Sequence, residues 1–206
     1  MAYVWEQRKL GDLAEILTGG TPNTQIIDYW FPKEIPWLSS GEVNKKRILS
    51  TDNMISKIGF DNSSARWVKK ESVLIALAGQ GKTRGTVAIN AIPLTTNQSI
   101  AGIEPNDSMN SEFIFQNFEK RYDEIRSMSS GDGSRGGLNK QIISNITLMV
   151  PVLEEQSNIG LFFRNLDNLI TLHQRRLCNY HCLSYFRLTQ TGISLLIPRP
   201  GFLVLE

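Results

Sequence analysis

Residues 151–177 read PVLEEQSNIGLFFRNLDNLITLHQRRL, and this stretch decides how the chain is organised. Seam positions recur at alternating spacings of four and three, which is typical of a helix that faces another helix. They are Ile159, Phe163, Leu166, Ile170, His173 and Leu177. Glutamates fall in the first turn and arginines in the last, as the helix dipole favours. We therefore expect one long helix with a largely apolar seam.

The partner of this seam is open at the level of sequence. At about 1.5 Å per residue, such a helix is long enough to project from a compact domain. One interpretation is pairing with a second copy, as a coiled coil or helical bundle, which gives a homodimer. The other is a terminal helix folded back on its own domain, because Phe162, Leu169 and Leu172 widen the apolar stripe.

Composition excludes little. The chain has 206 residues and a formal net charge of +2, which permits a nucleic-acid partner without demanding one. Neither a signal peptide nor an apolar run of about 20 residues is visible, so we expect a cytoplasmic protein with no membrane partner. Cys178 and Cys182 match no familiar zinc pattern with the two histidines, and we expect no metal site.

The residues before the helix predict an α+β fold, a compact β-rich domain with short helices. Strands are expected at 72–78, 85–92, 99–103 and 145–150, the first two forming a hairpin. A helix at 111–128 would cover the sheet, and 12–17 would be a short turn of helix at best. The predicted organisation is a compact domain at 1–150, a dimerisation helix at 151–177 and a C-terminal tail at 178–206.

Three polar, glycine-containing loops interrupt these elements: TGGTP at 18–22, GQGKTR at 79–84 and MSSGDGSRGGL at 128–138. A basic run, Lys45, Lys46 and Arg47, follows a short strand and a polar turn. The simplest interpretation is a solvated charge run at 45–47 and, for 128–138 alone, a disordered surface loop. The functional interpretation is a set of phosphate contacts in which glycine lets the backbone approach a ligand closely.

The stretch from Ala76 to Thr83 fits a relaxed phosphate-loop pattern, which would suggest a nucleotide hydrolase. That motif requires a helix to start at its lysine and threonine, because the helix N-terminus holds the phosphates. Here Lys82 and Thr83 precede glycine, β-branched residues and an early proline, which favour a strand. No nucleophile elbow or distinctive carboxylate constellation is present either, so we expect a non-catalytic protein with no catalytic residues.

Several segments together resemble the specificity subunit of Type I restriction-modification systems. They are WEQRKLGDLAEILTGGTP, IPWLSSGEVN, VLIALAGQGKTRGTVAI, TTNQSIAGI and the helix at 151–177, in this order along residues 5–177. The resemblance implies a target-recognition domain that reads one half of a split DNA target, followed by a conserved helix that acts as a spacer. It also implies methyltransferase and restriction subunits as partners. Those partners would use S-adenosylmethionine, ATP and magnesium, whereas this chain would need no cofactor of its own.

Under this resemblance, exposed polar and basic residues of the loops become candidate contacts to double-stranded DNA. They are Thr21, Ser39, Ser40, Asn44, Lys45, Lys46, Arg47, Gln80, Lys82, Thr83, Arg84, Asn97, Gln98, Arg135 and Lys140. Asn97 and Gln98 are equally suited to brace the strand that follows them.

Family members usually carry two recognition domains and two helical regions, and this chain has room for one of each. We therefore expect a half subunit that directs adenine methylation and cleavage by partner subunits, with self-association restoring the missing half. The alternative is a truncated protein-interaction module that binds the methyltransferase without reading DNA.

Overall fold

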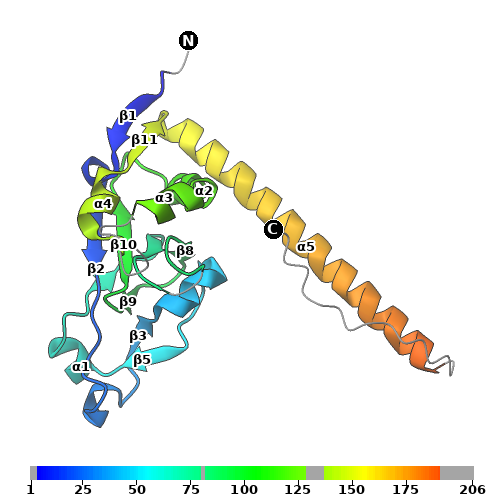
Figure 1. Cartoon of the computed structure of the whole chain (residues 1–206), viewed down its shortest axis with the longest axis horizontal. Coiled ribbons are helices and arrows are strands. Elements are labelled where there is room, and N and C mark those ends of the chain that lie inside the picture. The colour runs from blue at the N-terminus through cyan, green and yellow to red at the C-terminus, as the bar shows by residue number, and fades with distance from the viewer. Residues whose placement is uncertain (1–3, 80–81, 129–136, 191–206) are drawn as a thin grey trace. The chain divides into compact units, whose positions relative to one another are not determined.

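The computed structural model describes residues 4–79, 82–128 and 137–190, with side chains up to residue 176. Two compact units divide the chain, Met1–Phe163 and Arg164–Glu206. The first holds every sheet and the short helices, and the long helix begins in it (Figure 1). This confirms the predicted α+β class with a long C-terminal helix. None of the described helices combines the length and the apolar character needed to cross a membrane.

A five-stranded sheet lies at the centre of the first unit. Its order is β2 (Ala14–Thr18), β10 (Ile100–Pro105), β7 (Val73–Ala76), β8 (Val87–Asn90) and β4 (Arg47–Ile48). All neighbours are antiparallel except β4, which runs parallel to β8. The predicted hairpin is confirmed, because β7 and β8 pair with Ile75 opposite Val87.

A second sheet has four strands, in the order β5 (Asn53–Ile55), β3 (Ile35–Leu38), β9 (Leu94–Thr96) and β6 (Trp67–Val68). The central pair, β3 and β9, is parallel, and both outer strands are antiparallel to it. A separate two-stranded ribbon joins β1 (Glu6–Lys9) to β11 (Thr147–Val150), which brings the N-terminal segment beside the residues that lead into the long helix.

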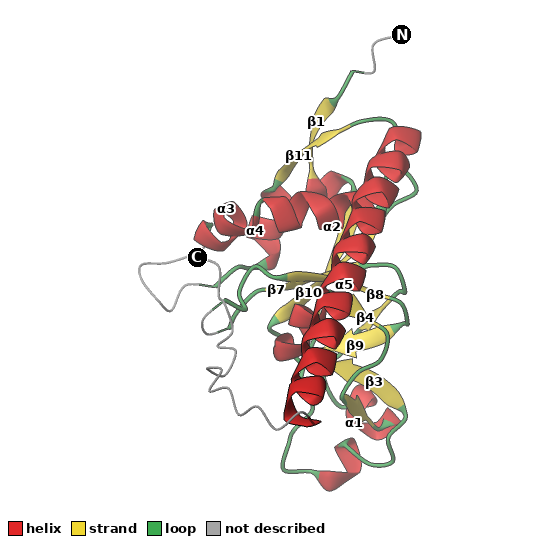
Figure 2. Cartoon of the chain, turned by 90° about the vertical axis from the view of Figure 1, so that its right-hand side faces the viewer, coloured by secondary structure: helices red, strands yellow, loops and turns green. Residues whose placement is uncertain are grey.

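Short helices connect and cover the sheets (Figure 2). They are α1 (Lys57–Asp61), α2 (Ser111–Lys120), α3 (Tyr122–Ser127) and α4 (Lys140–Asn145), with 3₁₀ turns η1 (Leu10–Asp12), η2 (Ile27–Tyr29) and η3 (Ser40–Lys45). Asn110 and Asn139 cap α2 and α4, each accepting a backbone N–H three residues on. The long helix, α5, is Leu153–Gln190 and continues past the end predicted from its seam.

Two expectations were wrong in detail. The helix predicted for 111–128 is two helices, because Arg121 leaves the helical conformation and its guanidinium donates to the Thr147 carbonyl oxygen, 2.8 Å away. Residues 12–17 hold the end of η1 and most of β2, not a helical turn. Buried Ala14 and Ile16 flank exposed Glu15, which is the two-residue period of a strand.

The core has two layers because both faces of β7 are covered. Val73 and Ile75 contribute to the larger cluster, which also contains the buried face of α2. Leu74 and Ala76 point the other way, into a smaller cluster shared with the second sheet. A strand buried on both faces reads as a continuous apolar run, which is how the sequence could identify it.

The first turns of α5 belong to the first unit and pack against its other elements. Gln156 is 1% exposed, and its side chain accepts from the Asn110 N–H and donates to the Ser108 and Pro151 carbonyls at 2.9–3.1 Å. A Cβ added to Gly160 would lie 2.9 Å from the Glu112 Cβ, so the helix and α2 are in close contact there. These contacts carry the compact unit beyond Pro151 to Phe163.

Candidate nucleic-acid interface

Loops from both larger sheets meet at one edge of the first unit. In the five-stranded sheet, β2 and β7 end where β10 and β8 begin, because these neighbours are antiparallel. The connection is direct: the Leu77 N–H donates to the Ser99 carbonyl oxygen at 2.8 Å. The 18–22 loop, the 97–99 turn and the β7–β8 loop therefore share this edge. We call it the loop edge.

Backbone contacts fix the 18–22 loop and the second sheet to this place. The Gly20 N–H donates to the Thr96 carbonyl oxygen at 2.9 Å, and the Asn97 N–H donates to the Leu38 carbonyl oxygen at 3.1 Å. A Cβ on Gly19 would lie only 2.0 Å from the Thr96 carbonyl oxygen. Glycine is required at position 19 because the two backbones approach so closely. These contacts hold the 18–22 loop against the end of β9.

Two of the residues predicted to contact DNA form an exposed pair at the loop edge. The Thr21 hydroxyl donates to the Gln98 Oε1 at 2.5 Å, which holds the amide with one carbonyl lone pair occupied. Both side chains are exposed. Asn97, by contrast, accepts the Ser99 N–H at 3.0 Å and so braces the turn. The sequence left open whether Asn97 contacts DNA or braces the strand that follows it, and this hydrogen bond favours the bracing role.

The β7–β8 loop and the start of α4 reach the same edge. Leu138 donates its N–H to the Leu77 carbonyl oxygen at 2.9 Å, which brings Lys140 and Lys82 onto adjoining segments. The Tyr122 hydroxyl donates to the Lys82 carbonyl oxygen at 2.8 Å and anchors the loop. Both lysines are exposed and take no part in the ion pairs found among the described residues.

The basic run at 45–47 is already paired within the fold. Lys46 forms an ion pair with Glu119. Arg47 donates two hydrogen bonds to Glu112, at 2.5 and 2.7 Å, and its guanidinium lies 4.5 Å from the centre of the Phe115 ring. These glutamates offset the charge that DNA phosphates would use, so the pairing favours a structural role for the run. Contact with DNA there stays a prediction.

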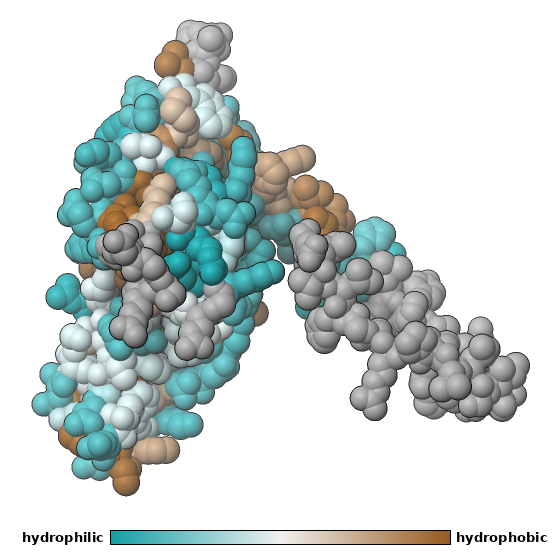
Figure 3. Space-filling view, viewed as in Figure 1, coloured by the Kyte–Doolittle hydropathy of each residue, from teal (hydrophilic) through white to brown (hydrophobic). Residues whose placement is uncertain are grey.

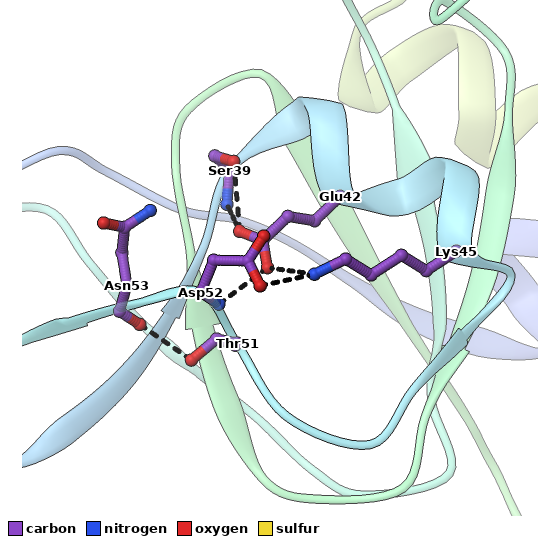
Figure 4. Close-up of polar contacts among 6 residues, drawn as sticks. All are labelled: Ser39, Glu42, Lys45, Thr51, Asp52 and Asn53. Atoms are coloured by element: carbon purple, nitrogen blue, oxygen red, sulfur yellow. Dashed lines mark hydrogen bonds and ion pairs between the residues drawn. The ribbon is translucent and has the colours of Figure 1, made fainter.

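Glu42 organises the turn that leads into this run (Figure 4). It is 5% exposed, and each of its oxygens accepts two hydrogen bonds. Oε1 accepts from the N–H and the hydroxyl of Ser39, and Oε2 from the Lys45 ammonium and the Asp52 N–H, at 2.8–3.1 Å. Lys45 also contacts Asp52 at 2.7 Å, and these carboxylates raise its pKa. Glu42 thus joins η3 to the residues before β5.

The remaining residues predicted to contact DNA come from several segments. Ser39 and Ser40 follow β3 beside the Asn97 turn, and Asn44 is exposed within η3. Thr83 and Arg84 are half-buried in the β7–β8 loop, where the Thr83 carbonyl accepts from the Thr86 hydroxyl at 2.6 Å. Gln80 and Arg135 lie outside the described residues.

The sequence analysis missed Arg66. This side chain is exposed and precedes β6, the edge strand of the second sheet. Its neighbours Ser64 and Ala65 lie against Gly20, and Trp67 pairs with Thr95 of β9, so the segment reaches the loop edge. A lone arginine outside any motif gives no signal in the sequence, and only the strand pairing brings it here.

Comparisons with known proteins identify the family. Residues 4–179 match the protein-family model described as Type I restriction modification DNA specificity domain. The chain belongs to this family. The resemblance drawn from the sequence segments is therefore confirmed.

Members of the specificity-domain family with curated names give the same assignment. The chain is 29% identical over 170 residues to the Type I restriction enzyme MjaIX specificity subunit of Methanocaldococcus jannaschii, covering 81% of this chain and 38% of that protein. It is 23% identical over 167 residues to the EcoR124I/EcoR124II specificity subunit of Escherichia coli, covering 80% and 41%. The chain thus spans about two fifths of the length of these relatives.

Solved structures share the fold of this specificity domain. The HsdS subunit from Thermoanaerobacter tengcongensis superposes with a TM-score of 0.61 at 16% identity, over 84% of this chain and 39% of that one. A chain from a study of complex assembly and conformational transition of the type I R-M system gives a TM-score of 0.70 at 17% identity, over 91% and 44%.

The phosphate-loop alternative lacks its structural context. Lys82 and Thr83 are followed by the strand β8, where a nucleotide-binding loop would need a helix N-terminus. Among the described residues, no three His, Cys, Asp or Glu side chains gather as a metal site would require.

Proposed function

We propose that this chain is a half specificity subunit that recognises one half of a split DNA target and directs the adenine methylation and cleavage carried out by partner subunits. The convergence of the 18–22 loop, the 97–99 turn, the β7–β8 loop and the start of α4 at the loop edge supports this most directly. An exposed edge with neutral hydrogen-bonding side chains and two lysines, neither of which forms an ion pair with the part of the chain that the structure describes, offers both phosphate and base-edge contacts.

Salt dependence tests whether the loop edge binds DNA. Each phosphate contact contributes about −0.9 to the slope of log affinity against log salt concentration. Lys82→Ala with Lys140→Ala should weaken binding to all duplexes similarly and reduce the slope by about 2. The matched control is Lys9→Ala with Lys33→Ala, which removes the same charge from other exposed positions. An equal change in both double variants would remove the loop edge from the DNA contact.

The partners and the absence of catalysis are part of the same proposal. Methyltransferase subunits would bind this chain and supply S-adenosylmethionine, and restriction subunits would supply ATP-driven cleavage with magnesium. A filter-binding assay with the methyltransferase present separates this proposal from the protein-interaction module. Selective retention of one duplex supports recognition, whereas capture of the chain without sequence preference supports the module.

We also propose that α5 joins two copies. Beyond residue 160 its apolar side chains are exposed in the single chain, among them Phe163 (42%), Leu166 (42%) and Ile170 (48%). An exposed apolar stripe along a helix is the usual feature of helix pairing. Ile159 is half-buried against the core, and His173 is exposed, whereas the side chain of Leu177 lies outside the described residues.

Light scattering tests this dimer. Leu166→Lys with Ile170→Lys should give a monomer, because two ammonium groups in the seam would lose their hydration on pairing. Asn168→Lys with Thr171→Lys adds the same charge to the opposite face and should leave a dimer. A dimer in the seam variant would move the contact elsewhere. Since a twofold axis relates identical readers, the dimer should favour a palindromic split target.

A further inference from the structure

We propose that Arg66 is a specificity-determining residue that reads the edge of a guanine in the major groove. This inference rests on the proposed function, and it adds a base contact from the second sheet to those expected from the loops. The chemical partner is the pair of acceptors, N7 and O6, that guanine presents side by side. The planar fork of an arginine matches this pair with two hydrogen bonds.

The backbone around Arg66 is held on both sides. On the N-terminal side, a Cβ on Gly20 would lie 2.1 Å from the Ser64 hydroxyl oxygen and 2.8 Å from the Ala65 nitrogen. Ala65 itself is buried in the cluster that contains Trp37. On the C-terminal side, Trp67 begins β6. A side chain that discriminates between nucleobases needs a backbone that is held in place, because small displacements spoil the geometry of paired hydrogen bonds.

The strand register places Arg66 toward the 97–99 turn. β6 is antiparallel to β9, with Trp67 opposite Thr95, so the residue before Trp67 lies toward the end of β9, where the 97–99 turn begins. The 18–22 loop contacts both sides of this junction, through Thr96 on one side and Ser64 on the other. Arg66 therefore extends the loop edge onto the second sheet.

Arg66 also differs from arginines with structural contacts. Arg47 is paired with Glu112 and Arg121 with Glu124, whereas Arg66 takes no part in the ion pairs or ring contacts found among the described residues. The residues that contact one another at this junction, Gly20, Ser64 and Thr96, are uncharged, as is the Thr21–Gln98 pair of the loop edge. Neutral polar neighbours suit a base edge, and the phosphate contacts are left to the lysines of the loop edge.

Selection from a pool of duplexes with a randomised segment tests the assignment, using the full chain and its Arg66→Lys and Arg66→Ala variants. The wild type should enrich a motif that contains a G·C pair. Both variants should lose the preference for guanine at one position, by about 5- to 150-fold, and keep the rest of the motif. Lysine keeps the charge without the fork, and Arg8→Ala removes an exposed arginine from the ribbon as a matched control.

The outcomes separate the inference from the function on which it rests. Equal weakening of every duplex by Arg66→Ala, with recovery in Arg66→Lys, would make the residue a phosphate contact and overturn the assignment. The wild-type motif recovered unchanged from both variants, or a motif without a G·C pair, would also overturn it. If the wild type enriched no motif, the proposed function itself would fail. Thermal unfolding of each variant should match the wild type, because Arg66 is exposed.

Discussion

Glu42→Gln should destabilise the first unit, because an amide cannot accept on both sides. Glu42 is buried and accepts two hydrogen bonds at each carboxylate oxygen. A glutamine keeps one accepting oxygen and turns an NH₂ group toward two donors. If the NH₂ faces Ser39, the hydroxyl can rotate to accept, but the Ser39 N–H is left without a partner. If it faces Lys45, the ammonium loses one of its two carboxylate partners and the Asp52 N–H is left without an acceptor.

The expected loss follows from these two arrangements. A hydrogen bond to a charged group contributes about 1.5–3 kcal/mol, and an unsatisfied buried donor costs about 1–3 kcal/mol. Lys45 can still turn to Asp52, and the Ser39 hydroxyl can still reorient, so part of the loss is recovered. We expect the free energy of unfolding to fall by about 2–4 kcal/mol.

Urea unfolding measures this loss. At an m-value of about 2 kcal/mol/M, the midpoint should fall by about 1–2 M. Glu6→Gln is the matched control, because Glu6 is 70% exposed and its contact with Arg8 is 3.8 Å long, so its midpoint should hardly move. Equal midpoints for Glu42→Gln and the wild type would refute the reasoning, and would mean that the network contributes little beyond what water offers.

Three further predictions concern other parts of the first unit. Gln156→Ala should lower the free energy of unfolding by about 2–4 kcal/mol in a thermal or urea titration, because three backbone groups lose the hydrogen-bond partner that this buried side chain gives them; an unchanged midpoint would contradict this. Gly19→Ala should cost about 1–3 kcal/mol because its Cβ would meet a backbone carbonyl, whereas Gly41→Ala, with open space around it, should cost little. Arg121 donates to Glu124 and lowers the pKa of that carboxyl, so its contribution is complete above about pH 4.5 and is lost as pH falls through the lowered pKa. Glu124→Gln should therefore lose less stability than the wild type between pH 7 and about pH 3 in urea titrations, and identical pH profiles would refute the role of this pair.

The elements that the sequence could predict are those with a local signal. β7 and β8 are continuous apolar runs on either side of a polar loop, and α5 has a long periodic seam. β4 and β6 are only two residues long, too short for any period to appear. The parallel pairing of β3 with β9 depends on the packing of the whole unit, which local periodicity does not record.

The candidate site divides in the same way. The 18–22 loop and the Asn97–Gln98 turn were predicted, and the structure brings them together. The basic run was predicted as phosphate contacts, but the glutamate that pairs with Arg47 is 65 positions away along the chain, so the offset charge was invisible. Arg66 was missed because its position near the loop edge follows from the pairing of β6 with β9, which its neighbours in the sequence do not reveal.

The close contact of Gly160 with Glu112 has a consequence for chimaeric proteins. Glu112 also holds Arg47, so α5, α2 and β4 meet through a single side chain. A recombinant fusion cut at Pro151 would set a foreign helix against this glutamate and would need glycine at the matching position. A junction placed after Phe163 transfers the first unit together with the first turns of α5. Such a fusion keeps the contact between Gly160 and Glu112, so it should fold when the unit is exchanged between related chains.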